Sequence, residues 1–476
     1  MLPLFSLAYP EIFLLIMICI LMLVDGFFRK KHPLVVGLLV NVTLIIVVVL
    51  LVPLFFHKAT VTFHHHFILN HMAVLIKLLM VSCVFVILLY SRQYLIQYKI
   101  PYSEFHMLAL VSLLGGMVIA SANSLLTLYL GLEMLSLPLY AMVAMSREDK
   151  TGAEAAMKYF VMGALASGIL LYGFSLIYGQ TSSLFLPQIA QTILNHSMPD
   201  KVSIFALVFV VVAIAFKLGA VPFHMWLPDV YEGAPTPVAA IISSVPKLAA
   251  FVLLVRTVVQ TMPSLAIDWQ PMFQILAILS LFLGNVVALV QTSIKRLFAY
   301  SAISHVGFIL LVLSLLHTHA QATALFYILT YAITVAGGFG VIILLSSKGV
   351  KADNIHDFTG LNSTDRWLAF MMLIILFSMA GIPPFVGFDA KLFVLGDLVK
   401  QHHYYLAIYA LIMTVIGAFY YIRIIKLMYF DQPRHSTPIA IAMDSRVFIG
   451  INGLLLLVLG MFPAMLMSFC RLSFGG

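Results

Sequence analysis

This chain of 476 residues is 63% hydrophobic and only 9% charged, with a mean hydropathy of +1.09. Soluble domains average roughly 45–50% apolar and about 25% charged residues, so this composition excludes a soluble globular protein. The three cysteines, Cys19, Cys83 and Cys470, form no CxxC pair, which argues against a disulfide framework, an iron–sulfur cluster or a zinc site. The net charge of +8 comes from scattered Lys and Arg residues, so a nucleic-acid-binding face is not expected.

Apolar runs bounded by polar, Pro or Gly residues predict about fourteen transmembrane helices. The predicted spans lie near residues 11–28, 34–56, 71–90, 105–122, 123–145, 155–178, 203–220, 235–258, 271–292, 297–316, 321–346, 368–398, 404–430 and 446–468. At about 20–21 residues each, these spans would use roughly 290 to 300 positions, which agrees with the hydrophobic fraction. No Lys or Arg precedes the first run, so we expect a retained helix rather than a cleaved signal peptide.

The basic residues indicate an orientation in the membrane. Sixteen of the 26 Lys and Arg residues follow odd-numbered spans. The opposite side contains five: Lys58, Lys201, Arg256, Lys400 and Arg471. Because cytoplasmic loops carry an excess of Lys and Arg, we expect both termini on the non-cytoplasmic side.

Two distant segments interrupt an apolar run in the same way. FKLGAVPFHMWLPD (216–229) and FSMAGIPPFVGFD (377–389) each contain a small residue, Val or Ile, and Pro, and Pro222 and Pro383 are 161 residues apart. The same offset maps spans four to eight onto nine to thirteen, and five-helix units must insert with opposite orientation. Inverted repeats with broken helices mark ion and substrate pathways in transporters. The alternative is a simple kink, since proline is common in membrane helices.

The expected fold is therefore an all-α polytopic membrane protein with two inverted five-helix repeats, each containing a broken helix. The chain divides into an N-terminal three-helix segment (1–104), a first repeat (105–260), a second, inverted repeat (261–430) and a C-terminal helix (431–476).

Six ionisable residues within the predicted spans are not explained by topology. They are Lys77, Glu133, Lys158, Lys217, Lys247 and Lys391. Placing one ionisable side chain at the bilayer centre costs about 2.5 to 3.5 kcal/mol of insertion free energy. We therefore expect that most of the six have a function. Desolvation favours neutral lysine and a nearby carboxylate favours the ammonium ion, so lysine beside a movable acid can load and release a proton.

The sequence suggests a role for each of the best candidates. Glu133 is followed by Pro138, which frees a backbone carbonyl, although a neutralising helix contact is the alternative for this carboxylate. Lys217 is expected at the C-terminal end of a half-helix, where the dipole favours a cation, and is the expected partner of Glu133. Lys247 follows Pro246 on the next span and is a candidate acceptor from Lys217. Lys391 is the expected corresponding group of the second repeat.

For the remaining candidates, a structural explanation competes with a role in proton transfer. Lys158 is a relay group or only a surface pair with Glu154, four residues earlier. Lys295 and His305 are candidates for linking the two halves, because histidine transfers protons near neutral pH, although Lys295 is equally explained as a topological anchor. Lys77 is expected only to snorkel towards the membrane surface.

Other histidines carry less information. The cluster His64, His65 and His66 has neither an HxxxH spacing nor a carboxylate partner, so we expect no metal site there. His317 and His319 are expected at the membrane interface.

Four segments together resemble a known family. They are PFHMWLPDVYEGAPTPVAAIISSVPKLAAF, YSAISHVGF, GIPPFVGFDAKLFVL and IGAFYYIRIIKLMYF. They resemble the antiporter-like membrane subunits of respiratory complex I, the proton-pumping NADH:quinone oxidoreductase, and VYEGAP and FYYIR most resemble the subunit N family of the bacterial enzyme. The resemblance covers essentially the whole chain.

The resemblance implies one proton channel in a bacterial inner membrane. Glu133 and Lys217 match the family's acid–lysine pair, Lys247 its connecting lysine and Lys391 its terminal lysine, while Lys295 and His305 match the central relay. It also implies that NADH, flavin, iron–sulfur clusters and quinone are bound by partner subunits, which include related antiporter-like subunits, and that this chain holds no cofactor. A cation/proton antiporter subunit and a purely structural helix bundle are the alternative functions.

Overall fold

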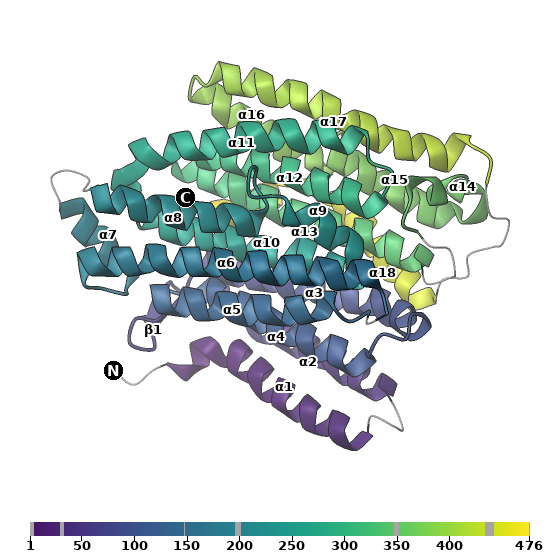
Figure 1. Cartoon of the computed structure of the whole chain (residues 1–476), viewed down its shortest axis with the longest axis horizontal. Coiled ribbons are helices and arrows are strands. Elements are labelled where there is room, and N and C mark those ends of the chain that lie inside the picture. Colours follow the sequence, from purple (N-terminus) through teal and green to yellow (C-terminus); the bar gives the residue numbers. More distant parts are fainter. Residues whose placement is uncertain are drawn as a thin grey trace.

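The computed structural model describes residues 4–28, 33–146, 148–195, 201–346, 352–433 and 442–475. Helices dominate these ranges. Their bounds are α1 (Tyr9–Phe28), α2 (Pro33–Leu54), α3 (His71–Gln97), α4 (Tyr102–Ser121), α5 (Leu125–Val143), α6 (Lys150–Thr181), α7 (Leu186–Asn195), α8 (Lys201–Leu218), α9 (Trp226–Gly233), α10 (Thr236–Leu254), α11 (Ala266–Leu289), α12 (Ile294–Leu313), α13 (Thr318–Ser346), α14 (Leu361–Thr364), α15 (Arg366–Ala380), α16 (Val386–Lys400), α17 (Tyr404–Phe430), α18 (Met443–Met461) and α19 (Pro463–Leu472). The long helices run side by side, with α1 and α17 at opposite edges of the bundle (Figure 1).

The predicted spans are confirmed, with one difference in form. Thirteen helices of the described chain are long and apolar enough to cross a membrane. The predicted span 368–398 is instead made by α15 and α16, two helices of 15 residues each. Each alone is shorter than the roughly 20 residues that a crossing needs, so the two together make the fourteenth crossing.

A short antiparallel hairpin marks one end of the bundle, which we call the hairpin end. Strand β1 (Thr60–Thr62) pairs with β2 (Phe67–Leu69), with Val61 opposite Ile68. His66 contacts Ser124 at the start of α5 through a hydrogen bond of 2.8 Å. The turn thus ties the N-terminal helices to the first predicted repeat.

The centre of the bundle is formed by α10 and α13, which pack against each other. In both, 94% of the apolar window is buried, against 39% for α1. Helices at the edges leave large apolar side chains such as Leu38 and Phe419 exposed. These exposed apolar side chains form the surface that lipid or neighbouring membrane helices cover in the membrane.

Two basic residues differ from expectation. Lys77 is fully buried and forms an ion pair with Glu11 of α1, so the expected snorkelling is wrong. Arg256, expected in a loop, is also buried because a π-helical turn (Val255–Gln260) continues α10, and it donates to the Ala120 carbonyl at 2.6 Å.

The structure describes only some of the basic residues from which the membrane orientation was inferred. Seven of the sixteen basic residues used for it lie outside the described residues. They are Arg29, Lys30, Lys31, Arg147, Lys348, Lys351 and Arg434.

Close packing of α4 on α5 depends on a residue without a side chain. A Cβ at Gly115 would collide with the backbone of Met134 and Leu135, and flexible side chains cannot relieve a clash with backbone. We expect Gly115→Leu to destabilise the protein by about 1–3 kcal/mol, the usual cost of overpacking. Thermal unfolding of the detergent-purified chain measures this loss.

Gly168→Leu on α6 is the matched control, since a Cβ there meets nothing within 4 Å. Equal unfolding temperatures for the two variants would contradict the assigned helix contact.

Candidate functional site

The first helix break lies between α8 and α9. Helix α8 ends at Leu218, and Gly219 follows with φ +73°, a conformation that glycine adopts without penalty. The Lys247 ammonium, from α10, donates to the Leu218 carbonyl, and the Trp226 indole N–H donates to the Phe216 carbonyl at 2.9 Å. A lysine therefore satisfies the last carbonyls of a half-helix, where the helix dipole favours positive charge.

Lys217 occupies the last turn of α8, as predicted, and faces α5. Its Nζ donates to Ser136 Oγ at 3.3 Å and to Tyr140 Oη at 3.4 Å. Glu133 lies one turn before Ser136, and its Oε1 is buried without a hydrogen-bond partner in the described chain. No ion pair joins Glu133 to Lys217 among the described residues. Their pairing as proton-transfer partners stays a prediction.

The second break repeats the first with a different lysine donor. Helix α15 ends at Ala380 and Gly381 has φ +82°. Lys391 Nζ donates to the Met379 carbonyl at 3.0 Å and to the Ala380 carbonyl at 2.9 Å. Here the lysine belongs to α16, the half-helix that follows the break, whereas Lys247 reaches the first break from a separate helix.

His305 lies beside the second break in a polar pocket of α12 and α13. Its Nδ1 hydrogen-bonds to Tyr327 Oη at 2.8 Å and its Nε2 to Tyr421 Oη at 3.4 Å. A cavity of about 20 Å³ separates His305 from Met379, whose carbonyl Lys391 binds. This volume holds about one water molecule.

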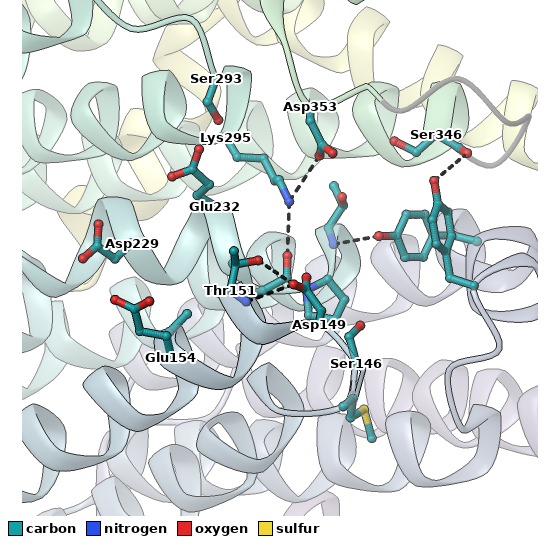
Figure 2. Close-up of a pocket in the computed structure, with 18 of the residues that line it drawn as sticks. Ser146, Asp149, Thr151, Glu154, Asp229, Glu232, Ser293, Lys295, Ser346 and Asp353 are labelled. Atoms are coloured by element: carbon teal, nitrogen blue, oxygen red, sulfur yellow. Dashed lines mark hydrogen bonds and ion pairs between the residues drawn. The ribbon is translucent and has the colours of Figure 1, made fainter.

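Lys295 faces a large cavity, the vestibule, at the end of the bundle opposite the hairpin (Figure 2). It donates to the Ala234 carbonyl at 3.3 Å and lies 3.4 Å from Asp353 Oδ1. The vestibule has a volume of about 1130 Å³, and the described residues that line it include seven carboxylates and three lysines. The Thr151 hydroxyl, which donates to Asp149 on its wall, lowers the pKa of that carboxyl and keeps it ionised. Excess negative charge concentrates cations in such a cavity.

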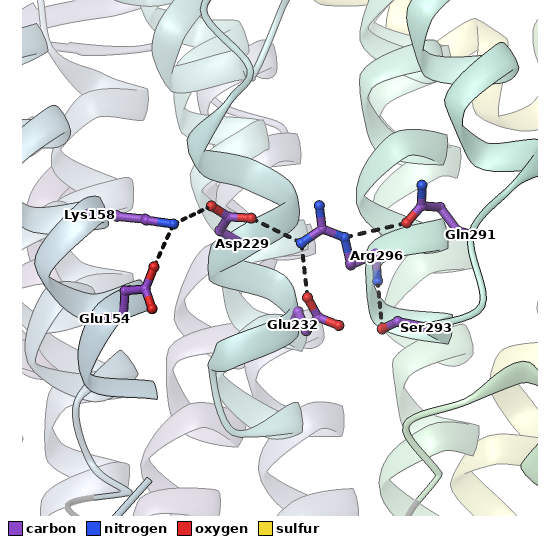
Figure 3. A network of polar contacts seen from close by, with 7 residues as sticks. All are labelled: Glu154, Lys158, Asp229, Glu232, Gln291, Ser293 and Arg296. Carbon is purple, nitrogen blue, oxygen red and sulfur yellow. Dashed lines mark hydrogen bonds and ion pairs between the residues drawn. The ribbon is translucent and has the colours of Figure 1, made fainter. Parts of the chain in front are cut away.

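Lys158 is a vestibule residue rather than a buried one. Its ammonium contacts Glu154 at 2.9 Å and Asp229 at 2.7 Å, and its side chain is 42% exposed. Asp229 also binds Arg296 at 3.0 Å, and Arg296 binds Glu232 at 2.9 Å (Figure 3). These contacts hold α9 from both sides, by α6 and by α12. The surface pair with Glu154 is present, and a relay role for Lys158 stays a prediction.

The buried acids that the sequence reasoning missed include Glu11 and Asp397. Glu11 pairs with Lys77, and Asp397 of α16 accepts hydrogen bonds from Thr323 and His319. His319 is thus more than an interfacial residue. Acidic residues within apolar runs were the available signal, but their partners lie more than sixty positions away in the sequence.

The candidate residues form two groups rather than one continuous chain. At the first break, Lys247 donates to the carbonyl of Leu218, the residue after Lys217. At the second break, Lys391 donates to the Met379 carbonyl, and His305 and Met379 line the same small cavity. No hydrogen bond or ion pair between described side chains joins Lys247 to His305, or Lys295 to His305. Lys295 and His305 are ten residues apart on α12, about 15 Å along the helix. Water would have to bridge these gaps.

The three adjacent histidines occupy the hairpin turn. His66 hydrogen-bonds to Ser124, and His65 packs near Phe185. In the described ranges, no group of three or more His, Cys, Asp or Glu side chains is arranged to hold a metal ion.

Comparisons with known proteins agree over nearly the whole chain. The profile of a family described as NADH:quinone oxidoreductase/Mrp antiporter, TM, matches residues 122–417. NADH-quinone oxidoreductase subunit N of Nitrosomonas europaea is 47% identical over 98% of this chain and 97% of the relative. The subunit N of Thioalkalivibrio sulfidiphilus is 49% identical over the same shares of the two chains.

Solved structures share the fold. A chain of respiratory complex I from Thermus thermophilus with bound aureothin has a TM-score of 0.82 and 28% identity, over 96% of this chain and 98% of that chain. A chain of the Mrp complex from Dietzia sp. has a TM-score of 0.85 but only 20% identity, over 98% and 96%. The Mrp likeness is one of fold alone.

The geometry of the second break predicts that the stability of the protein depends on Gly381. A side chain at φ +82° is strained by about 1–2 kcal/mol, and a Cβ would lie 2.8 Å from Lys391 Cδ. We expect Gly381→Ala to lower the thermal stability of the purified chain by this amount. Gly396→Ala on α16, where a Cβ meets nothing within 4 Å, should not lower it. A neutral Gly381→Ala would contradict the assigned break geometry.

Proposed function

This chain belongs to the family of NADH-quinone oxidoreductase subunit N, and we propose that its buried Glu, Lys and His side chains carry protons across the membrane for such an enzyme. Electron transfer from NADH to quinone takes place in partner subunits, which hold the flavin, the iron–sulfur clusters and the quinone. This chain supplies the membrane path and no redox centre. The observation that carries the proposal is the pair of helix breaks, each with a lysine ammonium on its last carbonyls.

The vestibule is the proposed proton entrance. Most basic residues of the chain follow odd-numbered spans, which puts the vestibule end on the cytoplasmic side and both termini on the other side of a bacterial inner membrane. The carboxylates of the vestibule raise the local proton concentration, and Lys158 and Lys295 on its walls exchange protons with them. The membrane neighbours are other subunits of the enzyme, including related antiporter-like subunits.

Proton loading takes place at the first break. When Glu133 approaches Lys217 its negative charge favours the ammonium form, and when it withdraws the desolvated lysine favours the neutral form. The released proton passes to Lys247 once that lysine has given up its own proton and is a neutral amine; Lys247 binds the carbonyl of the residue next to Lys217. Redox chemistry in the partner subunits supplies the free energy for moving the acid.

The second half-unit receives the proton through His305. The ring binds two tyrosine hydroxyls, and one water in the neighbouring cavity completes the connection to the break held by Lys391. We treat residues 105–260 and 261–430 as the two inverted half-units that these groups join. Lys391 is the terminal lysine of the path.

A cation/proton antiporter subunit without redox partners is the alternative. The relatives at 45–49% identity are named as subunit N of an oxidoreductase, whereas the Mrp likeness is limited to the fold. A purely structural bundle does not need ammonium groups at both breaks. The oxidoreductase subunit therefore has the stronger support.

Replacing either member of the loading pair should uncouple the path. In the assembled enzyme, Glu133→Gln or Lys217→Ala should lower coupled quinone reduction and proton pumping by on the order of tenfold or more, because a proton-transfer group is lost. Oxidation of NADH by the peripheral part should stay intact. Proton uptake by inside-out membrane vesicles, measured with a pH-sensitive dye, is the readout.

Lys201→Ala is the matched control, since Lys201 is an exposed lysine at the start of the same helix. Normal pumping by both Glu133→Gln and Lys217→Ala would refute the proposal. Sodium-dependent transport by membranes without the redox subunits would favour the antiporter alternative.

A further inference from the structure

A buried carboxylate lies on α16 beyond the second break, towards the hairpin end. Asp397 is six residues after Lys391, about 9 Å further along the helix. Its side chain is only 7% exposed. It accepts a hydrogen bond of 2.6 Å from the Thr323 hydroxyl, and His319 Nδ1 lies 3.0 Å from Oδ1 and 3.2 Å from Oδ2. Asp397 thus connects the interior of α16 to the first turn of α13.

The second nitrogen of the histidine defines its protonation. Arg471 Nη2 of α19 lies 3.3 Å from His319 Nε2. A guanidinium is only a donor, so Nε2 must accept and cannot carry a hydrogen. The remaining ring hydrogen is then on Nδ1, which donates to the Asp397 carboxyl group. This arrangement holds a neutral imidazole between a carboxylate and a guanidinium.

We propose that His319, positioned by Asp397, is the proton-release group at the hairpin end, and that Arg471 is the latch that closes it. This assignment rests on the proposed proton-transport function. When Arg471 moves away, Nε2 is free to bind the proton that the Lys391 ammonium gives up through water, and Lys391 becomes neutral. The carboxylate stabilises the imidazolium that forms. The imidazolium then returns to neutral by transferring its Nε2 proton to external water.

The surroundings of the pair fit a release site. His319 is 32% exposed, so its outer edge reaches the surface while Asp397 does not. Lys400 lies 4.0 Å from Asp397 Oδ1 but is 72% exposed, and its charge is therefore largely screened. His317 Nδ1 accepts a hydrogen bond from the His319 backbone N–H, so this contact does not involve the His319 ring. When Arg471 returns to Nε2 it excludes the imidazolium, which blocks protons from re-entering.

The latch is tested with the whole enzyme in proteoliposomes. With turnover inhibited and the outer side made acidic, Arg471→Met, which has no donor, should increase passive proton entry, whereas Arg471→Lys keeps a donor and should retain the low entry rate. His319→Gln should lose NADH-driven pumping. Asp397→Asn should lower the pumping rate and make it less sensitive to external acidity than in the unaltered enzyme, since an imidazolium without its counter-charge forms less readily. A merely structural contact would change neither the leak nor the pH profile.

His402→Gln is the matched control, because this exposed histidine at the same end contacts only Tyr404 through its hydrogen bond. Unchanged pumping and pH profile in His319→Gln, alongside lost pumping in Lys217→Ala, would overturn the release site but not the proposed function. Unchanged pumping in both would refute the proposed function itself. If His319→Gln or Asp397→Asn fails to assemble, the variants of the exposed Arg471 decide the question: equal leak in Arg471→Met and Arg471→Lys refutes the latch.

Discussion

The structure depends on how a broken helix is tolerated in a low-dielectric environment. Each break frees carbonyls that water would satisfy in a soluble protein and that hydrocarbon cannot. Here Lys247 and Lys391 donate to those carbonyls. The cost of burying an ammonium and the cost of freeing a carbonyl offset each other, so each defect stabilises the other. The same contact places a protonatable group where two half-helices meet.

Much of the architecture was predictable because it is encoded locally. Apolar run length determines the spans, and a small residue followed by Val or Ile and then Pro marks both breaks in the sequence. The position of Lys217 in the last turn of a half-helix follows from the same local rule. Hydropathy predicted a single span at 368–398, whereas the structure has two helices there. An interruption of five residues is too short for a hydropathy pattern to resolve.

Pairings between distant residues were not predictable in this way. Lys77 was expected to reach the surface because its partner, Glu11, is 66 positions away on another helix. Asp397 and His319 are 78 positions apart, and Asp229 joins Lys158 and Arg296 across three helices. A charge in an apolar run signals that a partner exists, but only the packing of helices identifies it.

The two lysine caps differ in one respect that bears on the order of events. Lys391 is part of the helix that follows its break, so the cap and the half-helix move as one body. Lys247 reaches α8 from α10, a helix packed in the centre of the bundle against α13. A sliding of α10 along its axis would therefore uncap the first break while leaving the second sealed. The first junction therefore depends on the position of a third helix, whereas the second depends only on the two half-helices that it joins.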